Sequence, residues 1–135
     1  FTADCTPILL HDPVTGAVGA AHAGWRGTVS GIGKVTVEKM VNEFDCNPAD
    51  IIAAIGPCIC QNCYEVDLPV LEAFAESGMD ITGVFKEGRD ENHFMLNLVA
   101  ANKNILLSAG IKEENIDISD LSEKLIGRIY FDYGS

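Results

Sequence analysis

The sequence PILLHDPVTGAVGAAHA, residues 7–23, predicts a buried β-hairpin. Its two halves, residues 7–11 and residues 17–23, are apolar and have the length of single strands. Between them, Pro13 fixes φ and Gly16 can adopt a positive φ, which is typical of a turn. We therefore expect two antiparallel strands joined by this turn.

The rest of the chain alternates helical patterns with short strands. Helices are expected from a cap at Thr28 or Ser30 to about Phe44, from Asp67 to Ser77, and from Leu96 to Ser108. Strands are expected at residues 51–55, 81–85, 116–119 and 128–132, with a polar loop at residues 86–92. This mixture predicts an α/β fold, in which helices cover a mixed β-sheet, in one domain over residues 1–135.

Composition limits the possible classes of function. The chain has 135 residues, 47% of them apolar, and a net charge of −11 from 9 basic and 20 acidic residues. So acidic a surface repels the nucleic-acid backbone, and no apolar run approaches the roughly 18 to 20 residues that span a bilayer. Because no signal peptide is visible at Phe1, we expect a cytoplasmic protein whose five cysteines are free thiols, metal ligands or nucleophiles.

Cys5 and His22 form the first candidate site. A hairpin centred near Val14 places the partner of Cys5 near His22 or Ala23, and directly opposed residues have Cβ atoms about 5 Å apart. At that distance a thiolate and an imidazole can share a metal ion, or the imidazole can deprotonate a cysteine nucleophile. A structural role is the third interpretation, because cysteine is also a common small core residue. The spacing alone leaves all three open.

Other motifs give weaker signals. The GWRG segment combines a glycine-rich turn before a helix with the guanidinium of Arg26, which suits an anion, although Trp25 can equally be packed on the core. The segment CICQNC, residues 58–63, has no second cysteine cluster to complete a metal site, so we expect a tight loop there. We expect His11 to end a strand and His93 to be a solvent-facing or capping residue.

Three segments together resemble one protein family. They are TADCTPILLHD (residues 2–12), HAGWRGTVSGI (residues 22–32) and IGPCICQNCYEV (residues 55–66), with weaker support from LNLVAANKNIL (residues 96–106). The pairing of ADC-x-P with HAGWRG is highly specific. The family is the YfiH-like group, long described as multicopper polyphenol oxidases with a laccase domain. Its members have more recently been assigned as purine nucleoside phosphorylases with adenosine deaminase activity.

The resemblance implies a fold and a ligand set. The fold is an α/β one of the YfiH type, grouped with a CNF-type bacterial toxin deamidase that uses a Cys–His pair, as in a cysteine hydrolase. The implied metal is usually zinc, held by Cys5, by His22 and by a histidine from a QVHG-like segment upstream of ADC. Neither that segment nor the family's FFSYRR-like run is found in this chain, so we expect the C-terminal portion of a longer family domain.

The resemblance also implies a chemistry. A zinc-activated water would attack C6 of adenosine, and phosphate would attack C1′ of the ribose. We expect Arg26 to bind the phosphate and Asp4, beside the ligand Cys5, to act as an acid–base group or to orient that ligand. The expected partners are therefore a purine nucleoside and phosphate, with no nucleic acid or membrane, and the protein is expected to be a monomer. The alternatives are a copper-dependent polyphenol oxidase and a metal-free hydrolase with a Cys–His pair.

Overall fold

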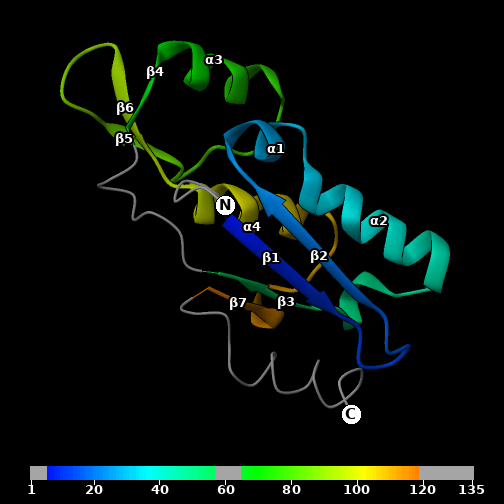
Figure 1. Ribbon diagram of the computed structural model, residues 1–135. Helices are drawn as coiled ribbons and strands as arrows, with labels where there is room; N and C mark the ends of the chain where they lie inside the picture. Colours follow the sequence, from blue (N-terminus) through cyan, green and yellow to red (C-terminus); the bar gives the residue numbers. More distant parts are fainter. Residues whose placement is uncertain (1–5, 57–64, 119–135) are drawn as a thin grey trace.

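The computed structural model describes residues 6–56 and 65–118 (Figure 1). Its larger sheet has the strand order β2-β1-β3-β7, with strands β1 (Thr6–His11), β2 (Val18–Ala23), β3 (Ile52–Ile55) and β7 (Ile116–Asp117). Strand β1 is antiparallel to both β2 and β3, whereas β3 and β7 are parallel. The mixed sheet that the sequence predicted is thus confirmed.

Two helices cover one face of this sheet, namely α2 (Ile32–Phe44) and α4 (Leu98–Ser108). Side chains alternate along a strand, so every second residue of β1 points toward these helices. The resulting core contains the fully or almost fully buried residues Ile8, Leu10, Ala23, Val37, Ile55 and Leu106. The other residues of β1 and β2 point to the opposite face, which also carries His22.

A second, smaller sheet has the order β4-β6-β5, with β4 (Glu65–Asp67), β6 (His93–Leu96) and β5 (Phe85–Glu87). Helix α3 (Leu68–Glu76) packs on it through Val70 and Phe74, which form a separate apolar cluster with Val66 of β4. The ring of Phe74 meets that of Phe85 edge to face, with centroids 5.3 Å apart. The short helix α1 (Trp25–Val29) adds Trp25 and Val29 to the same cluster.

The predicted helix between the hairpin and Phe44 is broken into two. Helix α1 begins at Trp25, and Gly31 then takes a left-handed conformation with φ of 74°, which glycine adopts readily, before α2 begins. The expectation that Thr28 or Ser30 caps the helix is wrong. Both hydroxyls instead donate to backbone carbonyls one turn earlier, at 2.7 Å and 2.9 Å.

The predicted strand at residues 81–85 is also wrong. Residues 82–84 form a turn, with Gly83 at φ of 74°, and β5 starts only at Phe85. The polar loop expected at residues 86–92 is shorter for the same reason. Strands β4 and β6 were not expected at all, and the strand predicted at 128–132 lies outside the described residues.

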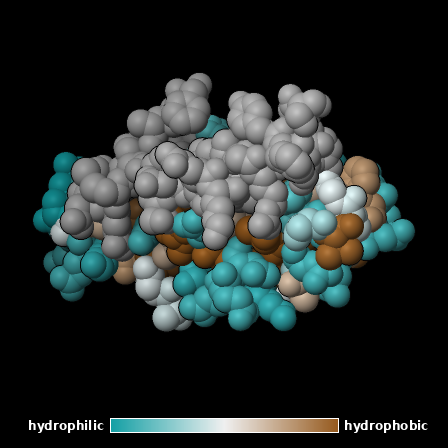
Figure 2. Space-filling model, turned by 90° about the horizontal axis from the view of Figure 1, so that it is seen from below, coloured by the Kyte–Doolittle hydropathy of each residue, from teal (hydrophilic) through white to brown (hydrophobic). Residues whose placement is uncertain are grey.

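The surface agrees with the acidic composition. On the face seen in Figure 2, the described residues are mostly hydrophilic and the apolar ones lie in small separate groups. No helix within residues 6–56 and 65–118 is both long and apolar enough to cross a membrane.

Candidate active site

His22 lies near the end of β2, on the face of the larger sheet that α2 and α4 do not cover. It is paired with Pro7, while the next residue, Ala23, is paired with Thr6 and is fully buried. The His22 side chain is exposed, as the alternation of a strand requires beside a buried Ala23. The imidazole of His22 is therefore not part of the core.

The register of the hairpin differs from the expected one. Its last pair is His11 with Val18, so the connection is centred between Val14 and Thr15 rather than at Val14. This register places His22 on the same face as the odd-numbered residues of β1. Asp4 and Cys5 lie outside the described residues, so their proposed roles beside His22 stay predictions.

A buried carboxylate fixes that register. Asp12 is fully buried, accepts hydrogen bonds from Val14 N at 2.9 Å and from Thr15 Oγ1 at 3.0 Å, and has the Cys46 thiol beside it. Burial by itself would raise the pKa of Asp12, but these hydrogen bonds outweigh burial and hold the pKa below its ordinary value. Burial raises the pKa of the Cys46 thiol, so this cysteine is held as a neutral thiol.

Behind His22, a buried polar network holds helix α1 in place. Thr28 Oγ1 donates to Gly24 O at 2.7 Å and accepts from Asn102 Nδ2 at 3.1 Å. Asn102 lies on α4 and also donates to Leu98 O at 2.8 Å. Both side chains are fully buried, so the turn that follows His22 is tied directly to the core helix.

Arg26 projects from α1 at the surface. Its guanidinium carbon lies 4.7 Å from the centre of the Trp25 ring, within the range of a cation–π contact. The side chain of Arg26 is exposed, whereas that of Trp25 is half-buried against the smaller apolar cluster. The packing of Trp25 on the core is thereby confirmed, and the binding of phosphate by Arg26 stays a prediction.

Trp25 also lines a shallow cleft of about 400 Å³. The other lining residues come from the smaller sheet, α3 and the β5–β6 loop, and are Glu65, Val66, Asp67, Val70, Arg89 and His93. This cleft was not expected from the sequence. Its walls come from segments that become neighbours only through the pairing of β4 with β6, and that pairing leaves no local pattern.

Ion pairs organise the mouth of this cleft. Arg89 Nε lies 3.2 Å from Glu65 Oε1, and Arg89 N donates to Glu65 Oε2 at 3.1 Å. The ring of His93 lies between Asp90 Oδ1, at 2.7 Å from Nδ1, and Arg89 Nη2, at 3.0 Å from Nε2. The hydrogen bond with His93 is the largest of several contacts that hold the pKa of Asp90 below its ordinary value. His93 is thus a strand residue in a polar network, not a capping residue.

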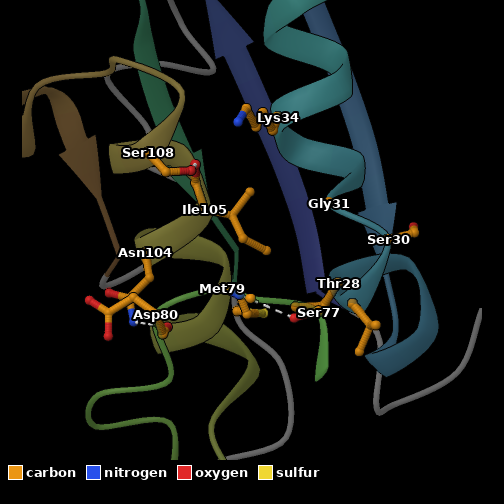
Figure 3. A pocket seen from close by; sticks show the side chains of 12 residues that line it. Thr28, Ser30, Gly31, Lys34, Ser77, Met79, Asp80, Asn104, Ile105 and Ser108 are labelled. Carbon is orange, nitrogen blue, oxygen red and sulfur yellow. Dashed lines mark hydrogen bonds between the residues drawn. The ribbon is translucent and has the colours of Figure 1, made fainter. Parts of the chain in front are cut away.

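A second cavity, of about 500 Å³, opens on the other side of α1, between the α1–α2 junction and α4 (Figure 3). Lys34 lies at one end of it, and Asp80 and Asn104 lie at the other. The hydroxyls of Ser77 and Ser108 donate to Phe74 O and Ile105 O, both at 2.6 Å, so their hydrogens are already used. Neither of the predicted site residues that the structure describes, His22 and Arg26, lines this cavity.

A metal site is not complete within the described part of the chain. Residues 6–56 and 65–118 contain no group of three or more His, Cys, Asp or Glu residues able to hold an ion. His11 is buried at the end of β1 as predicted, His22 is exposed on β2, and His93 belongs to the other sheet. The donor types Cys and His suit zinc, but of the predicted ligands the structure describes only His22.

Comparisons with known proteins agree with the resemblance. Residues 1–133 match a family model described as multi-copper polyphenol oxidoreductase laccase. A purine nucleoside phosphorylase of Deinococcus radiodurans is 47% identical over 82% of this chain and 42% of its own length. Adenosine deaminase RL5, from an unknown prokaryotic organism, is 41% identical over 85% of this chain and 44% of its own length.

Solved structures show the same relationship. The crystal structure of the hypothetical protein YfiH from Bacillus licheniformis superposes with a TM-score of 0.82 at 38% identity, over 89% of this chain and 45% of that one. The structure of YlmD from Geobacillus stearothermophilus has a TM-score of 0.80 at 37% identity, over 87% and 44%. The chain thus spans less than half the length of these relatives.

Proposed function

Because the chain belongs to the multi-copper polyphenol oxidoreductase laccase family, we propose that the protein is a zinc-dependent purine nucleoside phosphorylase with adenosine deaminase activity. Membership confirms the YfiH-like resemblance and the α/β fold that it implied. The names of the relatives support enzymatic activity toward small nucleosides at the level of the family.

One observation carries the proposal furthest. The motif that is most specific to the family places an exposed imidazole, that of His22, at the end of a strand fixed by the core, and Trp25 lines a cleft three residues later. A ligand histidine needs this combination of exposure and rigid support. We infer that His22 and Cys5 are two of the ligands, and that the third ligand is a histidine outside this sequence.

Other residues of this chain would bind phosphate, orient a ligand or exchange a proton. A bound zinc ion would supply Lewis-acid chemistry at this position. Arg26, exposed on α1, would bind phosphate through its fork of N–H donors. Asp4 would orient the ligand next to it or exchange a proton with the substrate.

The copper oxidase alternative is less well supported. A multicopper site needs several nitrogen ligands in one place. The three histidines lie at the buried end of β1, on the exposed face of β2, and in the smaller sheet. Within the described residues these imidazoles form no common ligand group.

The test uses full-length protein as purified. Its metal content is measured, and adenosine is incubated with and without phosphate while inosine, adenine and hypoxanthine are quantified. Zinc near one equivalent, adenine formed only with phosphate, and inosine formed without it are the expected results. Lys39→Ala, an exposed change on α2, serves as the control for Cys5→Ala and His22→Ala.

Two results would contradict the proposal. Full activity of Cys5→Ala toward adenosine would remove the ligand role of that thiol. Activity that resists a chelator but is lost on treatment with iodoacetamide would instead favour the metal-free hydrolase.

A further inference from the structure

The cleft beside Trp25 carries chemistry that the proposed metal site does not use. It holds about 400 Å³, which lies within the usual range for small-ligand pockets. The indole ring of Trp25 and carboxylates from β4 line it together. An aromatic surface and hydrogen-bond acceptors in one cleft suit a flat ligand that also bears hydroxyl donors.

Most charged groups of this cleft already have partners. Arg89 holds both carboxylate oxygens of Glu65, through its side chain at 3.2 Å and its backbone N–H at 3.1 Å. The ring of His93 is held at both nitrogens, by Asp90 and by Arg89. Glu65, Arg89 and His93 thus form a fixed rim of the cleft, and few of their hydrogen-bonding groups remain available to a ligand.

Asp67 differs from the other members of the rim. It is the residue before α3, yet its side chain caps no backbone N–H of that helix. Within the part of the chain that the structure describes, the exposed Asp67 carboxylate has neither a hydrogen bond nor an ion pair. Two carboxylate oxygens are therefore available as acceptors in the cleft that Trp25 also lines.

Trp25 supplies the complementary surface. Its ring is half-buried on the smaller apolar cluster, so its position is set by packing. Only two residues lie between it and His22, which limits the distance between the two Cα atoms to about 11 Å. A ligand that lies on the indole is thus within reach of chemistry at His22.

We propose that this cleft binds the nucleoside substrate, with the base against the part of the Trp25 ring that Arg26 and the apolar cluster leave exposed, and with the 2′- and 3′-hydroxyls of the ribose donating to Asp67. The assignment rests on the proposed function for the identity of the ligand and extends it by naming two residues that recognise the substrate. Stacking accepts any purine, whereas the pair of hydroxyl donors distinguishes ribose from 2′-deoxyribose.

The experiment combines two variants with two substrates in full-length protein. Values of kcat/KM are measured for adenosine and 2′-deoxyadenosine with the wild type, Asp67→Asn and the control Glu72→Gln, an exposed change on α3. We expect Asp67→Asn to lower kcat/KM for adenosine about tenfold or more, through KM, because a hydrogen bond to a charged group is lost. The loss for 2′-deoxyadenosine should be much smaller, and Glu72→Gln should change neither.

Fluorescence tests the stacking partner separately. Trp25 is the single tryptophan of this sequence, so the signal lost in Trp25→Phe is its own. Adenosine should quench that signal in the wild type, and Trp25→Phe, which keeps an aromatic ring, should fold and bind more weakly.

The outcomes separate this inference from the proposed function. Equal losses on both nucleosides in Asp67→Asn, or no loss on either, overturn the role of Asp67. Turnover of adenosine without quenching of Trp25 overturns the cleft and leaves the enzyme assignment standing. Saturating quenching of Trp25 by adenosine, in a protein with no activity on either nucleoside, overturns the enzyme assignment and leaves the cleft as a nucleoside-binding site.

Discussion

Asn102 on α4 donates a hydrogen bond to Thr28 on α1 across 3.1 Å, in a position where both side chains are fully buried. The same amide donates to Leu98 O at 2.8 Å. This contact joins the family's most specific motif to the core helix, and it ties down α1, the helix that carries Trp25 and Arg26.

Removal of this amide should destabilise the protein. Asn102→Ala leaves the Thr28 hydroxyl without one partner and opens space in a packed region, so we expect a loss of about 2 to 4 kcal/mol in the free energy of unfolding. Urea denaturation followed by circular dichroism measures it. Lys103→Ala, which breaks a partly exposed ion pair on the same helix, should cost at most about 1 kcal/mol. Equal losses in the two variants would contradict the structural role of Asn102.

The buried Asp12 should make stability fall in acid. Because its pKa is lower in the folded state than in the unfolded chain, the folded protein binds fewer protons near that pKa, and stability is full at higher pH. It is lost as the pH falls below about 4 and through the folded pKa. Urea midpoints measured from pH 6 to pH 3 should drop less steeply for Asp12→Asn than for the wild type. Parallel pH profiles would show that other groups control acid sensitivity.

Two glycines should respond in opposite ways to alanine. A Cβ on Gly88 would lie 2.5 Å from His93 O, so the backbone of the β5–β6 hairpin must shift, at a cost of about 1 to 3 kcal/mol. In α1, a Cβ on Gly27 would meet nothing closer than 3.7 Å, and alanine is the better helix former, so stability should be unchanged or rise by up to about 1 kcal/mol. Thermal unfolding of both variants checks this pair. A destabilised Gly27→Ala would refute the open environment described for that glycine.

His22→Ala should separate activity from folding. The side chain is exposed on β2, so its removal should change the free energy of unfolding by no more than about 0.5 kcal/mol. Loss of a metal ligand should lower bound zinc and reduce turnover of adenosine by more than about 100-fold. Metal content, turnover and the urea midpoint are measured on the same preparation, with Lys39→Ala as the reference. Retained zinc would contradict the ligand role.

The sequence predicted the elements whose pattern is local. The hairpin, β3, and the helices that became α2, α3 and α4 each carry a continuous apolar pattern with glycine, proline or asparagine at an end. Strands β4 and β6 were missed because each is only three or four residues long and is stabilised by a partner distant in sequence. The break at Gly31 was missed because a glycine does not reveal which φ it adopts.

The site was predicted in the same uneven way. His22 and Arg26 stand in one specific motif, so the sequence alone identified them as candidates. Asp67, Arg89 and His93 are ordinary polar residues in three separate segments, and the pairing of β4 with β6 brings them into the cleft that Trp25 also lines. The sequence did not specify which side chains share the face of His22. The hairpin connection is centred between Val14 and Thr15 rather than at Val14, and no pattern in the turn distinguishes these two centres.

The two apolar clusters make the protein modular. Ala23, next to His22, packs in the cluster under the larger sheet, whereas Trp25 packs with Val66 and Val70 in the other. Substitutions in the smaller sheet can therefore change the lining of the cleft beside Trp25 while the hairpin that carries His22 keeps its own support.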